Sequence, residues 1–236
     1  MDITISSLIS GARKAKGLTV IIDVFRAATT ASVILNNKAD AIIPIGNISE
    51  AFSLKRKNPA YILVAERDFL QVEGSDFGNS PFKIQNTDFS NKLVIMTTSA
   101  GTQGIANASS ADEILLAGFT NAQATISYIK KKNPKFVTLV PIGTNGIEIA
   151  DEDELCARYI KDSLEEKKPN FIQIKNYLLN YKTAQKFLEN RTETPRGDLD
   201  ICLSLNIFNF IMKVVKNKGV TEIVKEEIKI NNKLPT

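Results

Sequence analysis

Short apolar runs alternate with amphipathic segments along the first two thirds of the chain. The apolar runs are rich in Val and Ile, as strands typically are, and they cover residues 19–24, 40–45, 60–66, 92–97, 112–118 and 135–141. The segments between them carry apolar residues at intervals of three and four, which predicts helices over 27–37, 49–57, 101–108, 121–132 and 152–166. Strands that are apolar on both faces need cover on both sides. The pattern therefore predicts an α/β fold of three layers, with helices on both faces of a mostly parallel or mixed sheet.

The pattern changes after about residue 168. Two longer helices are predicted over 171–190 and 199–216, joined by the polar segment RTETPRGD at 191–198. A final edge strand or hairpin is predicted over 221–230.

Length and composition are those of an ordinary globular protein. The chain has 236 residues, of which 43% are hydrophobic and 24% are charged, and this suffices for one large domain or two small lobes. We expect a single α/β domain over residues 1–236, with an α/β lobe over 1–167 and a helical lobe over 168–236 as the alternative.

Histidine is absent from the sequence. This excludes Ser-His-Asp and Cys-His catalysis, phosphohistidine chemistry and His-ligated zinc. The remaining polar side chains suit a hard cation such as Mg²⁺, which prefers oxygen ligands. Cys156 and Cys202 lack the spacing of a metal site and are predicted to be buried free thiols.

The net charge of +4 comes from scattered lysines, such as those of 130–135 and 165–170. No aromatic residues interleave with them, so we expect no nucleic-acid partner. A weakly positive net charge is compatible with a small anionic substrate. No apolar run approaches the roughly 18 residues of a membrane span, and the N-terminus lacks a secretion signal. We expect a cytoplasmic protein without a membrane partner; the sequence leaves the oligomeric state open, with a homodimer as one option.

Opposite charges follow the first predicted strand, in IDVFRAATT at 22–30. In an open α/β sheet, ligands lie outside the carboxyl ends of the strands. Asp23 is either a helix cap or a metal ligand. Arg26 falls in a first helical turn, where a cation opposes the dipole, so it suits either a bound anion or a salt bridge to Asp23. Glu66 and Arg67 end another strand: they form an exposed pair worth about 0–1 kcal/mol, or they hold a metal and grip an anion.

Three further motifs follow strands or open helices. TTSAGT (97–102) offers hydroxyl groups, including that of Ser99, for phosphate, although ordinary helix capping explains it equally well. GSDFGNSP (74–81) is a plain loop, or it carries Asp76 and Asn79 to the site; its Ser-Pro end is a cap followed by proline. DEDE (151–154) is a helix start with Asp151 as cap, or part of a metal site.

These motifs, in this order, resemble the 2-phosphosulfolactate phosphatase family. The similarity is carried by IDVFRAATT (22–30), AERDF (65–69), GSDFGNSP (74–81), TTSAGT (97–102), GFTNA (118–122) and residues 142–157. The resemblance implies a Mg²⁺-dependent phosphatase that hydrolyses (R)-2-phospho-3-sulfolactate to 3-sulfolactate and phosphate, a step of coenzyme M biosynthesis. It also implicates a set of site residues: Asp23, Arg26, Glu66, Arg67, Asn79, Ser80, Thr97, Thr98, Gly101, Thr102 and Asp153.

We expect a metal ion on Asp23, Glu66 and Asp153, and these three together with Arg26 as the catalytic groups. Hydroxyl and N–H groups of 97–102 are expected to contact phosphate, with the arginines on phosphate, sulfonate or carboxylate. Two alternatives stay open. One is a Mg²⁺-dependent phosphatase for another 2-phospho-hydroxyacid, and the other is a non-catalytic anion- or nucleotide-binding protein on the same scaffold.

Overall fold

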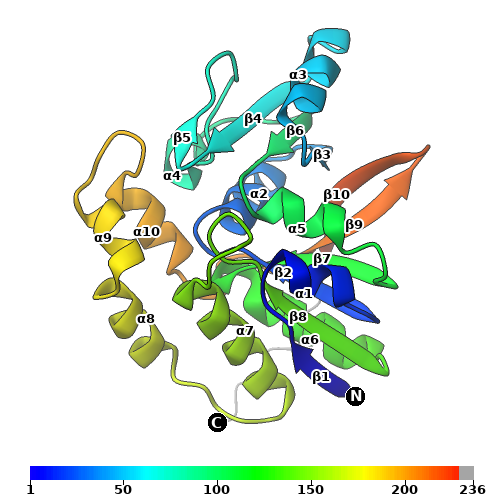
Figure 1. Ribbon diagram of the computed structural model, residues 1–236, viewed down its shortest axis with the longest axis vertical. Helices are drawn as coiled ribbons and strands as arrows, with labels where there is room; N and C mark the ends of the chain where they lie inside the picture. Colours follow the sequence, from blue (N-terminus) through cyan, green and yellow to red (C-terminus); the bar gives the residue numbers. More distant parts are fainter. Residues whose placement is uncertain (229–236) are drawn as a thin grey trace.

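The computed structural model describes residues 1–228, and a single mixed sheet of ten strands forms its centre (Figure 1). The strand order is β1-β8-β2-β7-β9-β10-β3-β6-β4-β5. The strands are β1 (Asp2–Ile5), β2 (Leu18–Ile22), β3 (Ala41–Pro44), β4 (Ile62–Arg67), β5 (Leu70–Gln71), β6 (Leu93–Thr97), β7 (Glu113–Ala117), β8 (Phe136–Pro141), β9 (Phe210–Asn217) and β10 (Val220–Glu227). The helices are α1 (Leu8–Lys14), α2 (Ala27–Asn36), α3 (Ile48–Lys57), α4 (Pro81–Ile84), α5 (Gly101–Asn107), the 3₁₀ turn η1 (Phe119–Asn121), α6 (Ala122–Lys132), α7 (Asp151–Leu164), α8 (Phe171–Leu179), α9 (Lys182–Leu188) and α10 (Arg196–Cys202).

Strand β2 shows why the layers form. All five of its residues are buried, and alternate side chains enter different cores, because successive residues of a strand point to opposite faces. Val20 and Ile22 pack in the core that holds apolar residues of α6, α7 and α8–α10. Ile21 packs in the core of α1, α2 and α5 on the other face. The predicted three-layer α/β fold is confirmed.

Two groups of parallel strands make up most of the sheet. Strands β1, β8, β2 and β7 form one group, and β3, β6 and β4 form the other. The antiparallel hairpin β9–β10 lies between them and pairs antiparallel with β7 on one side and β3 on the other. The two groups consequently run in opposite directions along the sheet. Figure 1 shows them as separate parts of the molecule, with β3, β4 and β6 above the other group.

The six predicted strands are present, and the five helices predicted before residue 168 begin and end within two residues of their expected bounds. The first long C-terminal helix is present but breaks into α8 and α9. The predicted helix over 199–216 is wrong, because it ends with α10 at Cys202 and residues 210–217 form β9. The apolar residues of FIMKVV satisfy a helical period locally, but they pair with β7 and β10.

The chain's last described strand also differs from expectation. The predicted segment does form a strand, β10, which makes a hairpin with β9, but this strand is internal to the sheet rather than an edge. Residues 229–230 of the predicted segment lie outside the described residues. Strand β1, at the edge beside β8, was not predicted.

Two helix N-termini and the two cysteines bear on local predictions from the sequence. The Ser80 hydroxyl accepts a hydrogen bond from Lys83 N at 3.3 Å, so it caps α4 as predicted, with Pro81 as the first helical residue. Helix α7 has Ala150 rather than Asp151 in the cap position. Both cysteines are buried free thiols, as predicted.

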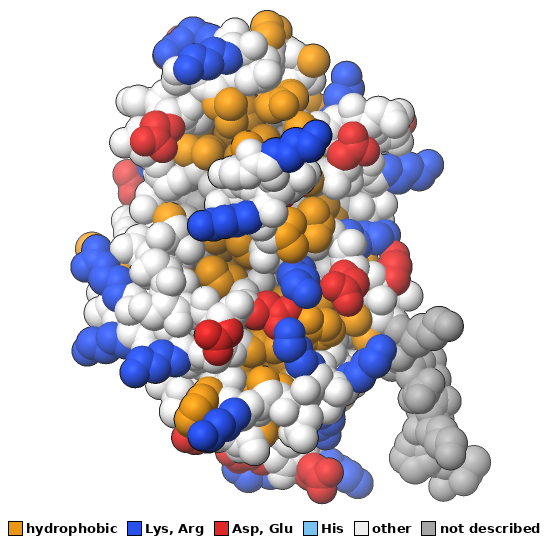
Figure 2. Space-filling view, turned by 90° about the vertical axis from the view of Figure 1, so that its right-hand side faces the viewer, with side chains coloured by type: hydrophobic (Ala, Val, Ile, Leu, Met, Phe, Trp, Pro, Cys, Tyr) orange, Lys and Arg blue, Asp and Glu red, His pale blue; other side chains and the backbone are white. Residues whose placement is uncertain are grey.

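Within residues 1–228, no helix combines the length and the apolar character needed to cross a membrane. On the face shown in Figure 2, lysine, arginine and acidic side chains are interspersed with apolar surface. Basic side chains of the described residues therefore form no continuous stripe on that face.

Candidate active site

A narrow cleft lies where the carboxyl ends of the two parallel groups meet. Residues after β2 and β8 line it from one side, and residues at the ends of β4 and β6 line it from the other. It encloses about 40 Å³ of space. Its lining residues are Asp23, Phe25, Arg26, Glu66, Phe69, Asn79, Thr98, Ser99, Ala100, Gly143, Thr144, Asn145, Glu152 and Asp153.

Asp23 lines this cleft directly after β2 and is 5% exposed. Its Oδ1 accepts a hydrogen bond from Ala27 N at 3.0 Å, which ties it to the start of α2. Gly101 approaches it closely, because a Cβ at that position would lie 2.8 Å from Asp23 Oδ2. Burial raises the pKa of Asp23 to about 6, and the charge of Glu66 adds to this, while the N–H groups of Ala27 and Gly101 and the charge of Arg26 lower it. The site favours a proton or a cation at this carboxylate.

Asp153 occupies the first turn of α7, where both of its carboxylate oxygens accept backbone hydrogen bonds. Oδ1 accepts from Val24 N at 2.7 Å, and Oδ2 accepts from Gly143 N at 2.9 Å. The side chain therefore joins the segment after β2 to the loop after β8. Burial, together with the charges of Asp23 and Glu152, raises the pKa of Asp153 well above its ordinary range.

Glu152 lines the cleft and belongs to the DEDE run that the sequence offered as part of a metal site, although only Asp153 of that run was predicted as a ligand. Its side chain is only 3% exposed, and its Oε2 is buried without a hydrogen-bond partner among the described residues. Burial raises the pKa of Glu152 to about 7, and repulsion from Asp23 and Asp151 contributes. An unpaired buried carboxylate oxygen is costly unless a cation or a proton meets it.

The other two acids of the DEDE run point away from the cleft. Asp151 accepts a hydrogen bond from the Tyr177 hydroxyl at 2.5 Å, and Glu154 accepts one from the Ser7 hydroxyl at 2.5 Å. Four consecutive acids thus split into two inward and two outward residues. The helical phase of α7, which the sequence does not give on its own, makes this division.

Glu66 comes from the end of β4 and accepts three hydrogen bonds. Its Oε1 accepts from Phe69 N at 2.7 Å and from the Ser99 hydroxyl at 3.1 Å, and its Oε2 accepts from Ser99 N at 3.3 Å. The carboxylate thereby fixes the turn after β4 against the loop after β6. It faces the cleft, but most of its acceptor capacity is in use.

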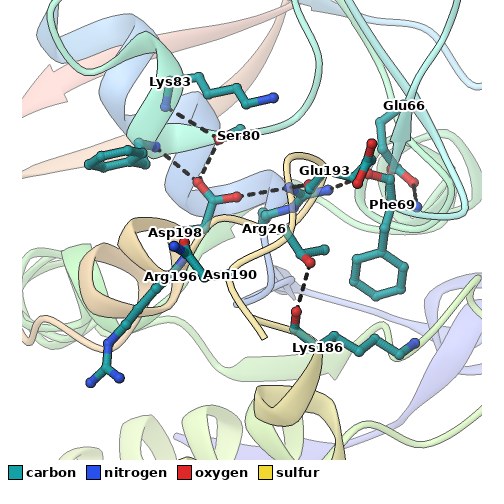
Figure 3. A network of polar contacts seen from close by, with 12 residues as sticks. Arg26, Glu66, Phe69, Ser80, Lys83, Lys186, Asn190, Glu193, Arg196 and Asp198 are labelled. Carbon is teal, nitrogen blue, oxygen red and sulfur yellow. Dashed lines mark hydrogen bonds and ion pairs between the residues drawn. The ribbon is translucent and has the colours of Figure 1, made fainter. Parts of the chain in front are cut away.

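Arg26 forms an ion pair with Asp198 of α10 rather than with Asp23. Its Nη1 lies 2.8 Å from Asp198 Oδ2 and also donates to Glu193 O at 2.9 Å, while Nη2 donates to Phe69 O at 3.0 Å (Figure 3). The guanidinium also lies 5.8 Å from the centre of the Phe187 ring. The alternative of a salt bridge to Asp23 is therefore wrong. Guanidinium has five N–H donors, and three of them are used within the part of the chain that the structure describes, which leaves two for a ligand.

Asp198 is an important residue that sequence reasoning missed. It is fully buried and also accepts from the Ser80 hydroxyl at 2.7 Å and from Phe82 N at 3.0 Å. It therefore holds α4, α10 and Arg26 together, as Figure 3 shows. The resemblance to the family continues weakly through GDLDICLSL (197–205), but it gave Asp198 no role, and the partners of Asp198 lie more than 110 residues away in the sequence.

The loop TTSAGT lies between β6 and α5, and much of its hydrogen-bonding capacity is used internally. Thr98 N donates to the Thr102 hydroxyl at 3.0 Å, and the Thr98 hydroxyl accepts from Thr102 N at 3.3 Å. Thr98, Ser99 and Ala100 line the cleft. The Thr98 hydroxyl accepts from Thr102 N and donates no hydrogen bond among the described residues, so its proton can be donated to an oxygen in the cleft.

Arg67 and Thr97 lie just outside the cleft lining. Arg67 Nη2 donates to the Thr97 hydroxyl at 2.9 Å and to Gly46 O at 3.3 Å. This pair connects the ends of β3, β4 and β6. The structure thus brings Arg67 near the cleft without making it a lining residue.

Comparison with known proteins now identifies the family. A model of the 2-phosphosulpholactate phosphatase family matches residues 3–217. The chain belongs to this family. A protein of Caldicellulosiruptor saccharolyticus named probable 2-phosphosulfolactate phosphatase is 37% identical over 172 residues, 71% of each chain. Proteins of the same name from Clostridium tetani and Thermoplasma volcanium are 31% and 30% identical, over 81% and 87% of this chain and 87% and 92% of their own.

Members of this phosphatase family are phosphoric monoester hydrolases, so a cleft lined by carboxylates and hydroxyls suits the family. Most of the predicted site residues meet there: Asp23, Arg26, Glu66, Asn79, Thr98, Ser99 and Asp153. Asn79 is 5% exposed, and its Oδ1 is buried without a partner among the described residues. Ser80, Thr97 and Thr102 support neighbouring elements, and Asp76 accepts from Leu63 N and Lys55 rather than facing the cleft.

Proposed function

We propose that this chain is a Mg²⁺-dependent phosphatase that hydrolyses (R)-2-phospho-3-sulfolactate to 3-sulfolactate and phosphate, the reaction of a coenzyme M biosynthesis-type step. The observation that carries the proposal is the family match across residues 3–217. The convergence of its strand-end motifs on one cleft supports it. We also propose a cytoplasmic location, as expected from the sequence.

The carboxylates of the cleft fit a magnesium ion. Among residues 1–228, no three Asp, Glu, Cys or His side chains form a group that could hold a metal ion by themselves. Mg²⁺ is commonly bound by one or two carboxylates, waters and the substrate phosphate instead. Asp23 and Glu152 fit this mode, because Glu152 Oε2 has no partner among the described residues and burial raises the pKa of both carboxylates, with repulsion from Glu66 adding at Asp23 and repulsion from Asp23 adding at Glu152.

The sequence predicted Glu66 and Asp153 as further ligands. Asp153 already accepts two backbone hydrogen bonds and Glu66 accepts three hydrogen bonds. We therefore propose Asp23 and Glu152 as the residues that hold the ion, with Asp153 and Glu66 fixing the loops around it. The bound ion would neutralise phosphate charge and lower the pKa of a water molecule.

The chain's own groups would position the phosphate. The free proton of the Thr98 hydroxyl and the two remaining N–H donors of Arg26 can donate to non-bridging oxygens in the cleft. Such preorganised donors stabilise charge on the phosphoryl oxygens in a largely dissociative transition state. Water oxygen bonds to phosphorus, the ester P–O bond breaks, and the ester oxygen gains a proton to become the hydroxyl of 3-sulfolactate.

Phosphate release from racemic phosphosulfolactate tests the proposal. We expect release with millimolar Mg²⁺ and loss of release with EDTA, restored by added Mg²⁺. A panel with 2-phospholactate and 2-phosphoglycerate separates the proposed substrate from other 2-phospho-hydroxyacids. Absence of phosphate release from every substrate at millimolar Mg²⁺ would refute the enzymatic proposal.

A further inference from the structure

A second, larger pocket adjoins the cleft and shares three lining residues with it: Arg26, Phe69 and Asn79. Its volume is about 350 Å³. The other walls are the β5 strand, the loop before α4, α4 itself and residues 192–193. Figure 3 shows the border between the two spaces, where Arg26 lies between Glu66 and Asp198.

The cleft is too small to hold the whole substrate, so part of the substrate must lie in an adjoining space. Its 40 Å³ is room for only a few water molecules, since one water needs roughly 10–15 Å³ by this measure. A phosphoryl group fits there, but a three-carbon acid with a second anionic group does not. Asn79 lies at the border, and its unpaired Oδ1 can accept a hydrogen bond from the hydroxyl that hydrolysis creates on the product.

The charged side chains of the second pocket favour an anion. Lys83 extends from α4 into its lining, and its ammonium group has no ion pair among the described residues. Arg26 lines both spaces, but its two remaining N–H donors serve the phosphate in the cleft, so Lys83 is the cation left for a second anionic group. Glu193 is the one acidic lining residue, and both it and Lys83 are exposed, so solvent and salt screen both charges. With Arg26, the charged lining residues carry a net charge of +1.

We propose that the second pocket binds the anionic group that lies farthest from phosphorus, the sulfonate, and that Lys83 determines this preference. The inference rests on the proposed function, because it places the non-phosphate part of that substrate. In phosphosulfolactate the sulfonate is carried by a CH₂ group, and this CH₂ group is bonded to the carbon that carries the phosphate ester. It is therefore the group that reaches farthest into the adjoining pocket when phosphate occupies the cleft.

The test compares Lys83→Gln with Lys92→Gln on two substrates. Lys92 is exposed, precedes β6 and lines neither space, so its replacement is a matched control. For phosphosulfolactate, Lys83→Gln should raise KM about tenfold, the order expected for losing one hydrogen bond to a charged group, with kcat nearly unchanged. For 2-phospholactate, which has no sulfonate, KM should change by less than twofold. Equal changes for both substrates would overturn the inference.

Calorimetric binding of the product separates this inference from the proposed function. The wild-type protein should bind 3-sulfolactate more tightly than lactate in the presence of phosphate, and Lys83→Gln should remove that preference while Lys92→Gln retains it. This result would support the pocket even if no hydrolysis were found. Equal binding of the two acids by the wild-type protein, or no binding of 3-sulfolactate, would reject the pocket even if phosphosulfolactate were hydrolysed.

Discussion

Replacing Asp198 by Asn should strongly destabilise the protein. Asn has nearly the same shape, and its Oδ1 can still accept from the Ser80 hydroxyl and Phe82 N. Its amide NH₂, however, would face Arg26 Nη1, which now lies 2.8 Å from Asp198 Oδ2. Asp198 is fully buried and the Arg26 side chain is 2% exposed, so the guanidinium charge would lose its partner away from water. Removing one partner of a buried ion pair costs about 3–5 kcal/mol.

This loss is large beside a typical unfolding free energy of about 5–15 kcal/mol. With a urea m-value of about 3 kcal/mol/M, the urea midpoint should fall by about 1–2 M. Circular dichroism is the suitable probe, since the chain contains no tryptophan. Asp200→Asn is the matched control on the same helix: Asp200 is 61% exposed and lies 3.9 Å from Arg196, so its replacement should cost less than about 0.5 kcal/mol. A loss below about 1 kcal/mol in Asp198→Asn would contradict the buried ion pair.

Three further predictions concern the carboxylates and the loop beside them. Glu152→Gln should weaken Mn²⁺ binding, measured by electron paramagnetic resonance, at least tenfold. Asp151→Asn, at the neighbouring residue that points away from the cleft, should change Mn²⁺ binding by no more than about twofold. Equal effects of the two substitutions would remove Glu152 from the metal site. The raised pKa values of Asp23 (about 6) and Glu152 (about 7) mean that the folded protein retains protons which the unfolded chain loses near about pH 4. Their stabilising contribution is therefore full below that pH and is lost as pH rises through 6 and 7. In EDTA, the unfolding free energy of Glu152→Gln relative to wild type should increase from pH 5 to 8, and a constant difference would refute the titration. Gly101→Ala would put a Cβ 2.8 Å from Asp23 Oδ2, so it should lower the unfolding free energy by about 1–3 kcal/mol and abolish most of the phosphatase activity. Gly118→Ala, whose Cβ meets nothing nearer than 3.7 Å, should retain both stability and activity. Equal activities of the two variants would contradict the close approach of Gly101 to Asp23.

Much of the site was predictable because its residues follow strands. Asp23, Glu66 and Thr98 each come at the end of an apolar run that the sequence marks clearly. Ligands collect outside the carboxyl ends of parallel strands, so this rule alone selected three lining residues of the cleft. It did not reveal that β2 and β4 belong to groups that run in opposite directions and face one another across the cleft.

The two main failures of prediction from the sequence, at Asp198 and over residues 199–216, have a common cause. Asp198 was missed because its contacts to Arg26 and Ser80 span more than 110 residues of sequence, and the helix predicted over 199–216 failed because β9 forms only by pairing with β7 and β10. Neither partner is visible within a local window. Propensity over a short segment is weaker than the burial and pairing that distant elements supply.

The sequence by itself determined the alternation of strands and helices, the absence of histidine chemistry and the strand-end residues that meet in the cleft. These are local properties: hydrophobic period, residue type and position after a strand. Only the tertiary structure decided that Arg26 pairs with Asp198, that Asp153 joins two loops, and that Glu152 presents an unpaired oxygen to the cleft. A charged side chain's partner is set by which elements pack together, and packing joins residues that the sequence keeps far apart.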